Sequence, residues 1–130
     1  MADANKDQTI DFDRMSMISE ASTILAQLDK KSMTEIKSFN NPPEGVKDVL
    51  MASIILLGRP KSEQTWSIAK KELGSFDMHK RAAELDFEKI PMDRRREAMK
   101  YLSKYSYEHI MKISRAAAAF YQWAHAIASE

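Results

Sequence analysis

The sequence predicts an all-α fold: a compact bundle of about six helices whose first and last helices pair antiparallel. Apolar residues recur at helical spacing along the chain, and no segment alternates as a β-strand would. The three glycines and four prolines fall where helices begin or end. A chain of 130 residues has room for one domain with one hydrophobic core.

Composition excludes several classes of protein. The chain has no cysteine, which excludes a disulfide framework, a cysteine-ligated zinc site and thiol chemistry. Its N-terminus is acidic and polar, unlike a signal peptide, and its longest apolar stretch, residues 49–57, is too short to cross a bilayer. A net charge of +1 lacks the basic excess typical of a nucleic-acid-binding protein. We therefore expect neither nucleic acid nor a membrane as the partner.

The first predicted helix covers residues 15–38 and follows a polar lead-in, residues 1–14, that is either native or added in cloning. Its apolar residues fit two heptad-like seams, namely Ile18, Ala21, Leu25 and Leu28, or Met17, Ala21, Ile24 and Leu28. A wide apolar stripe docked on a globular core would use the same residues. The sequence leaves these interpretations open.

A second helix is predicted over residues 42–57, because proline ends the first helix and is tolerated in the first turn of the next. Asn41 is the expected N-cap, and Glu44, at the start of a polar stripe with Lys47 and Asp48, complements the helix dipole. The second half of this helix is apolar on every side and belongs in the centre of the core. Gly58 ends it.

Three further segments follow, a helix over residues 65–73, a short segment over residues 77–87 and a helix over residues 91–104. In the last of these we expect Met92, Met99 and Leu102 to point inward and Arg94, Arg95 and Arg96 to point mostly outward. Ser106 is the predicted cap of a final helical stretch that reaches Glu130.

The final stretch carries a second heptad-like seam, formed by Ala116, Phe120, Trp123 and Ile127. The two seams lie at opposite ends of the chain, which suggests an antiparallel pair. Each seam covers only two or three heptads, so the globular part must anchor the pair.

Catalytic and cofactor sites are not predicted. His79, His109 and His125 are far apart and lack the spacing of metal ligands. The glycine-rich phosphate-binding motifs G-x-x-x-x-G-K-[ST] and G-x-G-x-x-G are both missing from the sequence. The acidic residues are scattered among lysines and arginines, as on solvated faces. We therefore expect a binding module without cofactor or metal, not an enzyme.

The order and spacing of several short motifs resemble dynein heavy chains over about residues 20–128. The similar residues are 35–47 with their Pro42-Pro43 pair, Leu56-Leu57-Gly58, Trp66, Asp86-Phe87 to Ile90, Ser106-Tyr107, Ser114-Arg115-Ala116 and Trp123. The resemblance implies a six-helix globular tip on an antiparallel coiled-coil stalk, with the first, third and sixth tip helices facing a microtubule. It divides the chain into a first stalk helix (15–38), a tip (39–114) and a last tip helix that runs into the second stalk helix (115–130).

The resemblance also implies partners and contact residues. The partners would be α/β-tubulin, at the junction of the two subunits, and the rest of a heavy chain whose ATPase ring lies elsewhere. Sliding of the first stalk helix against the second would switch the affinity. Its motifs and the exposed basic residues point to five microtubule contacts: Lys47, Arg115, Lys80, Arg81 and Arg94. The stalk seam would comprise Ile18, Ala21, Leu25, Leu28, Phe120, Trp123 and Ile127.

Two departures from the family pattern lower the positive charge near the expected contacts. Gln122 replaces a lysine that many cytoplasmic members carry, and Asp48 directly follows Lys47. These departures favour an axonemal form over a cytoplasmic one, and the expected location is cytoskeletal. The rival hypothesis is a helical scaffold that pairs with a helix of another protein through its terminal seams.

Overall fold

The computed structural model describes the backbone of residues 2–74 and 78–129 and the side chains of residues 14–60, 62–73 and 78–129. The described residues form helices and no strand, which confirms the predicted all-α class. The α-helices are α1 (Ala2–Ala26), α2 (Lys30–Lys37), α3 (Glu44–Leu56), α4 (Trp66–Gly74), α5 (Met78–Ala83), α6 (Met92–Leu102), α7 (Tyr107–Ile113) and α8 (Arg115–Ala128). Two short 3₁₀ helices, η1 (Lys61–Glu63) and η2 (Phe87–Lys89), lie in the connections. Residue 77 and Glu130, the predicted ends of two segments, lie outside the described residues.

The first predicted helix is in fact two helices. α1 begins at Ala2, so its backbone covers the expected lead-in, and it ends at Ala26. Asp29 then caps α2, because its side chain accepts a hydrogen bond of 2.8 Å from the backbone N–H of Ser32. The hydrogen bond also lowers the pKa of the Asp29 carboxyl. This new cap explains why a helix restarts at Lys30, after a break of three residues (27–29).

The last predicted helix is also two helices, divided at Ser114. The extended backbone of this residue (φ −158°, ψ 123°) ends α7, and its hydroxyl accepts a bond of 3.1 Å from the N–H of Ala117 to start α8. Ser106 caps α7 as predicted, by accepting a bond of 3.2 Å from the N–H of His109. These two divisions account for the eight α-helices of the described residues, where about six were expected.

α3 runs through the centre of the core. Its last residues, Ile54, Ile55 and Leu56, are fully or almost fully buried, as predicted. Gly58 ends it with a positive φ of 108°, and the N–H groups of Gly58 and Arg59 bond back to Ile55 and Ile54. The prediction of Asn41 as its N-cap was wrong. The cap position is Pro43, without a side-chain hydrogen bond, because the residue before a proline is held extended and a helix cannot start at Pro42.

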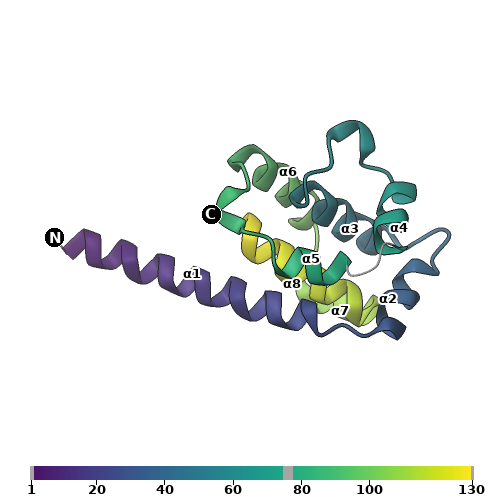
Figure 1. Ribbon diagram of the computed structural model, residues 1–130, viewed down its shortest axis with the longest axis horizontal. Coiled ribbons are helices and arrows are strands. Elements are labelled where there is room, and N and C mark those ends of the chain that lie inside the picture. The colour runs from purple at the N-terminus through teal and green to yellow at the C-terminus, as the bar shows by residue number, and fades with distance from the viewer. Residues whose placement is uncertain (1, 75–77, 130) are drawn as a thin grey trace.

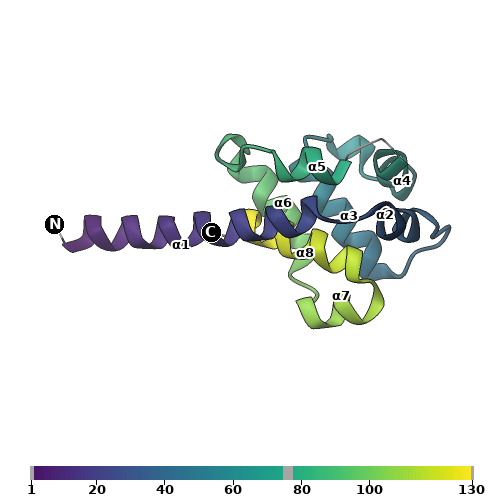
Figure 2. The same cartoon turned by 60° about the horizontal axis from the view of Figure 1, so that its bottom comes forward.

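Figures 1 and 2 show that α1 lies alongside α8 and runs in the opposite direction, as the antiparallel prediction required. The first half of α1 extends past the end of α8, away from the compact body. α8 packs against α1, α2, α3, α6 and α7, so it is the second central element of the core. We call the opposite end of the body, formed by α2, α7 and the first residues of α3 and α8, the distal end.

Candidate functional site

Lys47 is exposed on a helix that is otherwise almost wholly buried. Every residue of α3 except Glu44 and Lys47 is buried. The Lys47 ammonium group has no ion-pair partner among the described side chains. A lysine in this position contributes little to the fold, so its charge is available to a partner.

Asp48, the next residue, does not neutralise Lys47, because it points inward. It is 8 % exposed, and its carboxylate accepts a hydrogen bond of 2.7 Å from the Tyr105 hydroxyl. Lys104 lies 3.7 Å from the same carboxylate oxygen. Burial and the contact with Asp48 raise the pKa of Tyr105, so the hydroxyl remains a donor. Asp48 is thus held by Tyr105 and Lys104 and forms no ion pair with Lys47, although its charge remains close to Lys47 along the helix.

Arg115 is the first residue of α8 and is exposed. The N-terminus of a helix carries partial positive charge, so an arginine there is slightly unfavourable for the helix itself. None of the described acidic side chains forms an ion pair with it. α7, which directly precedes Arg115, packs on the start of α3, where Gly45 lies against Ile110. Lys47 and Arg115 thus belong to the same distal end.

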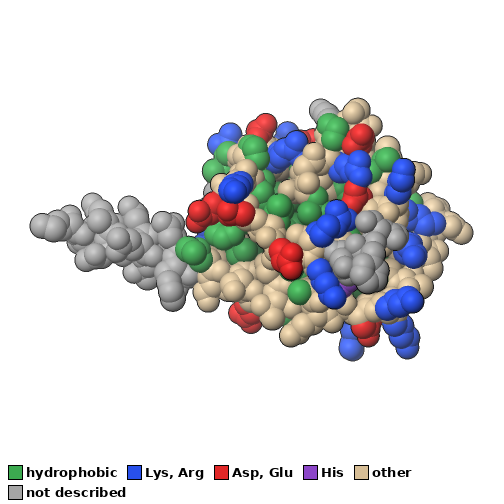
Figure 3. Space-filling view, viewed as in Figure 1, with side chains coloured by type: hydrophobic (Ala, Val, Ile, Leu, Met, Phe, Trp, Pro, Cys, Tyr) green, Lys and Arg blue, Asp and Glu red, His purple; other side chains and the backbone are tan. Residues whose placement is uncertain are grey.

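The distal end carries further lysines that the sequence did not single out. Lys30, Lys31 and Lys37 are exposed on α2, which packs against α4 and α8. Figure 3 shows Lys and Arg side chains along this end of the body. The spacing of Asp29 and Ser32 is the signal that would have separated α2 from α1 and identified these lysines as part of the tip.

Lys80 and Arg81 are exposed on α5, which packs mainly against α1 and α4 and not at the distal end. The Arg81 guanidinium lies 3.2 Å from Glu72, which also binds Arg59. Burial alone would raise the pKa of Glu72, but the hydrogen bonds from the two arginines outweigh it and lower the pKa. Arg81 therefore ties α5 to α4.

The arginines at 94–96 lie in three different surroundings. Arg94 donates a bond of 3.1 Å to the Ile55 carbonyl at the end of α3, which makes it a capping residue of the fold. Arg95 is 8 % exposed and donates to the carbonyls of Phe87 and Ile90, so the prediction that it points outward was wrong. Met92, expected inward, is 44 % exposed.

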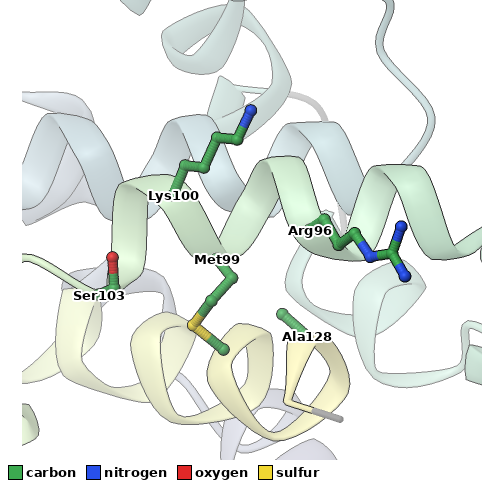
Figure 4. A pocket seen from close by; sticks show the side chains of 5 residues that line it. All are labelled: Arg96, Met99, Lys100, Ser103 and Ala128. Carbon is green, nitrogen blue, oxygen red and sulfur yellow. The ribbon is translucent and has the colours of Figure 1, made fainter.

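Arg96 and Lys100 border a hollow of about 420 Å³ between α6 and the end of α8. Figure 4 shows their side chains leaving α6 in different directions, while Met99 points toward α8. This hollow lies at the C-terminal end of α8, opposite Arg115. The arginine run therefore does not join Lys47 and Arg115 in one surface.

The predicted seam residues lie mostly in the core. Ile18, Ala21 and Leu25 on α1 and Phe120, Trp123 and Ile127 on α8 are at most 4 % exposed, and Leu28 is partly buried after the end of α1. The sequence reasoning missed Arg14, whose guanidinium donates a bond of 2.9 Å to the Ile127 carbonyl. Its position four residues before Ile18, on the same face of the helix, is the signal that was available.

Two further groups of features are absent from the described part of the chain. No helix there is both long enough and apolar enough to cross a membrane. No three acidic or histidine side chains are placed there to hold a metal ion.

The chain is similar to known proteins over almost its whole length. The sequence model of the family described as the microtubule-binding stalk of dynein motor matches residues 3–129. The dynein-1-beta heavy chain of the flagellar inner arm I1 complex of Chlamydomonas reinhardtii is 33 % identical over 110 residues, which are 83 % of this chain and 2 % of that protein. Human dynein axonemal heavy chain 2 is 38 % identical over 73 residues, or 56 % of this chain and 2 % of that protein. The chain thus spans about 2 % of the length of these relatives.

Proposed function

Because this chain belongs to the family of microtubule-binding stalks of dynein motors, we propose that it binds microtubules through its distal end, with Lys47 and Arg115 as the principal contacts. The family is a stalk and not a catalytic domain, so the role of the chain is binding. The observation that carries the residue assignment is that two exposed cations lie at the distal end and neither has an ion-pair partner among the described side chains.

The chemistry of the distal end suits an acidic partner. Lys47 and Arg115 are accompanied there by the lysines of α2, and Asp48 is turned inward. Single exposed ion pairs contribute only about 0.2–1 kcal/mol, so several must act together to hold a filament. We therefore propose a spread electrostatic contact with tubulin, at the junction of its two subunits, that weakens as salt rises.

The division into tip and stalk follows from the same proposal. α1 and the last turns of α8 form the base of the stalk, and α2, residues 39–114 and the first turns of α8 form the tip. We propose that the register of α1 against α8 controls the affinity. α8 supports this, because one uninterrupted helix extends from Arg115 at the distal end to Ile127 beside α1.

We place the parent protein in the axoneme of a cilium or flagellum. The relatives named above are axonemal or flagellar dyneins, and Gln122 stands where many cytoplasmic members carry lysine. The motor activity would reside in the remainder of the heavy chain, joined through the stalk.

Co-sedimentation with microtubules tests the proposal. Lys47→Ala and Arg115→Ala should each weaken binding roughly two- to fivefold, the equivalent of about 0.5–1 kcal/mol per lost contact. Lys89→Ala is the matched control, because it removes an exposed lysine from η2, away from the distal end. Wild-type pelleting by both test variants would contradict the site. Failure of the unaltered chain to pellet, together with concentration-dependent self-association, would favour the helical scaffold.

A further inference from the structure

Arg14, in the middle of α1, joins this helix to the C-terminal end of α8. Its guanidinium donates to the carbonyl of Ile127, which is among the last carbonyls of α8 and has no partner within the helix. A cation near the C-terminus of a helix is also favoured by the helix dipole. The contact links residues 113 positions apart in the sequence. It therefore fixes the axial position of α1 on α8.

Only one of the two seams on α1 is in use. Ile18 and Leu25 are 4 % and 0 % exposed, whereas Met17 and Ile24 of the other seam are 63 % and 38 % exposed. Met17 and Ile24 each precede a residue of the seam in use by one position, and Ala21 and Leu28 belong to both seams. Exchanging one seam for the other therefore needs only a partial rotation of α1, smaller than the rotation of about 100° between neighbouring residues. Met17 and Ile24 therefore give α1 a second apolar face, at positions where most surface helices carry polar residues. We call the position of α1 in which this face would pack on the body its second seating.

The space for such a seating is already present. Met17 lies at the border of a groove of about 540 Å³ whose other walls come from α8 and the residues before α7. Its lining from α8 includes Tyr121, Gln122 and Ala126. On the other flank of α1, next to its contacts with α5, a second groove of about 450 Å³ lies between α1, the end of α5 and η2. Both flanks of α1 thus adjoin open space into which its side chains can turn.

In the present position of α1, the hydrogen bonding of Arg14 is also incomplete. The Arg14 Nε atom is buried without a hydrogen-bond partner, so the guanidinium makes only part of the bonds that it offers. A buried donor without a partner is unfavourable. Each position of α1 therefore has a cost. The present one leaves Met17 and Ile24 exposed, and the second one would lose the Arg14 hydrogen bond.

We propose that Arg14 is the positioning residue that holds α1 in its present register on α8, and that its loss shifts α1 toward the seating in which Met17 and Ile24 face the body. The inference rests on the proposed control of affinity by the register, and it assigns that control to a specific contact. Arg14 touches no partner in this scheme and acts only through the position of α1.

Thiol labelling of single introduced cysteines tests the proposal, since the chain has no cysteine of its own. Met17→Cys and Ile24→Cys report the second seam, and Ser19→Cys is the control, exposed on the other flank of Ile18. Each is made with Arg14 intact, with Arg14→Gln and with Arg14→Lys. In the Arg14→Gln background we expect labelling at positions 17 and 24 to slow roughly two- to tenfold, as the equilibrium moves toward the second seating. Labelling at position 19 should not slow, and Arg14→Lys, which keeps a cationic donor, should largely restore the original rates.

The outcomes separate a change of register from a loss of structure. Local unfolding would speed labelling at all three positions, and that result, like unchanged rates, would overturn the proposal. Microtubule co-sedimentation of the same variants provides a second readout. Slower labelling at positions 17 and 24 with an altered affinity supports both the Arg14 contact and control by the register. Slower labelling with an unaltered affinity supports the Arg14 contact alone and contradicts the register control.

Discussion

Replacing Tyr105 with phenylalanine should destabilise the protein by removing one hydrogen bond at the base of the distal end. The Tyr105 hydroxyl donates a bond of 2.7 Å to Asp48, whose side chain is 11 % exposed. A hydrogen bond to a charged group contributes about 1.5–3 kcal/mol. Because Lys104 remains near the carboxylate, at 3.7 Å, we expect the lower part of that range, about 1.5–2 kcal/mol.

Thermal unfolding followed by circular dichroism measures the effect. For a chain of this size, 1 kcal/mol corresponds to a shift of about 4 °C, so the Tm of Tyr105→Phe should fall by about 6–8 °C. Tyr107→Phe is the matched control, because Tyr107 is 37 % exposed and its hydroxyl has no hydrogen-bond partner among the described residues. Its stability should stay within about 0.5 kcal/mol of the unaltered chain.

A double-mutant cycle shows whether Asp48 is the cause. In an Asp48→Ala background the Tyr105→Phe change should cost much less, because its partner is already gone. Equal midpoints for Tyr105→Phe and Tyr107→Phe, or an undiminished cost in the Asp48→Ala background, would refute the reasoning. Asp48 would then be tolerated in the interior for another reason, and the inward turn that leaves Lys47 unopposed would need a different explanation.

Two further predictions concern stability. Gly58→Ala should lower the free energy of unfolding, measured by chemical denaturation, by about 1–3 kcal/mol. The cost is backbone strain, because φ is 108° and the added Cβ would meet only ordinary contacts. An unchanged unfolding midpoint would contradict this. Burial lowers the pKa of His125 in the folded chain from the ordinary value of 6.5. Between the folded and unfolded pKa values the unfolded chain binds more protons. The free energy of unfolding should therefore fall as the pH drops from about 6.5 toward the folded-state pKa. Urea unfolding at about pH 7.5 and about pH 5.5 should show this loss, and His125→Gln should reduce it.

The features that local chemistry determines were predictable from the sequence. Gly58 as a helix end, Ser106 as a cap and the buried run at residues 54–56 each depend on residues within one turn of one another. In these cases the neighbours along the chain supply the physical cause.

Three errors of another kind arose where a residue outside the helix supplies the partner. Helical periodicity alone places Arg95 outward, but the carbonyls of Phe87 and Ile90, released by the turns around η2, draw it into the interior. Asp48 turns inward because Tyr105, 57 positions away, donates to it. Arg14 gains its role from Ile127 at the other end of the chain. No pattern within a single helix contains these partners, so only the fold reveals them.

The two connections from the stalk base to the distal end differ in stiffness. α1 reaches α3 only through the break at residues 27–29, the short helix α2 and the turn before Pro43, so a shift of α1 along its axis can be absorbed in the backbone before it reaches Lys47. α8 has no break over roughly 21 Å, and ten of its residues are buried, including Ala116, Ala117, Ala118 and Ala119, whose small side chains let neighbouring helices approach closely. A close-packed helix moves as one body, so a change at Ile127 is carried to Arg115. If the register of α1 controls the affinity as proposed, the signal should therefore travel along α8 and not along the chain from α1 to α3.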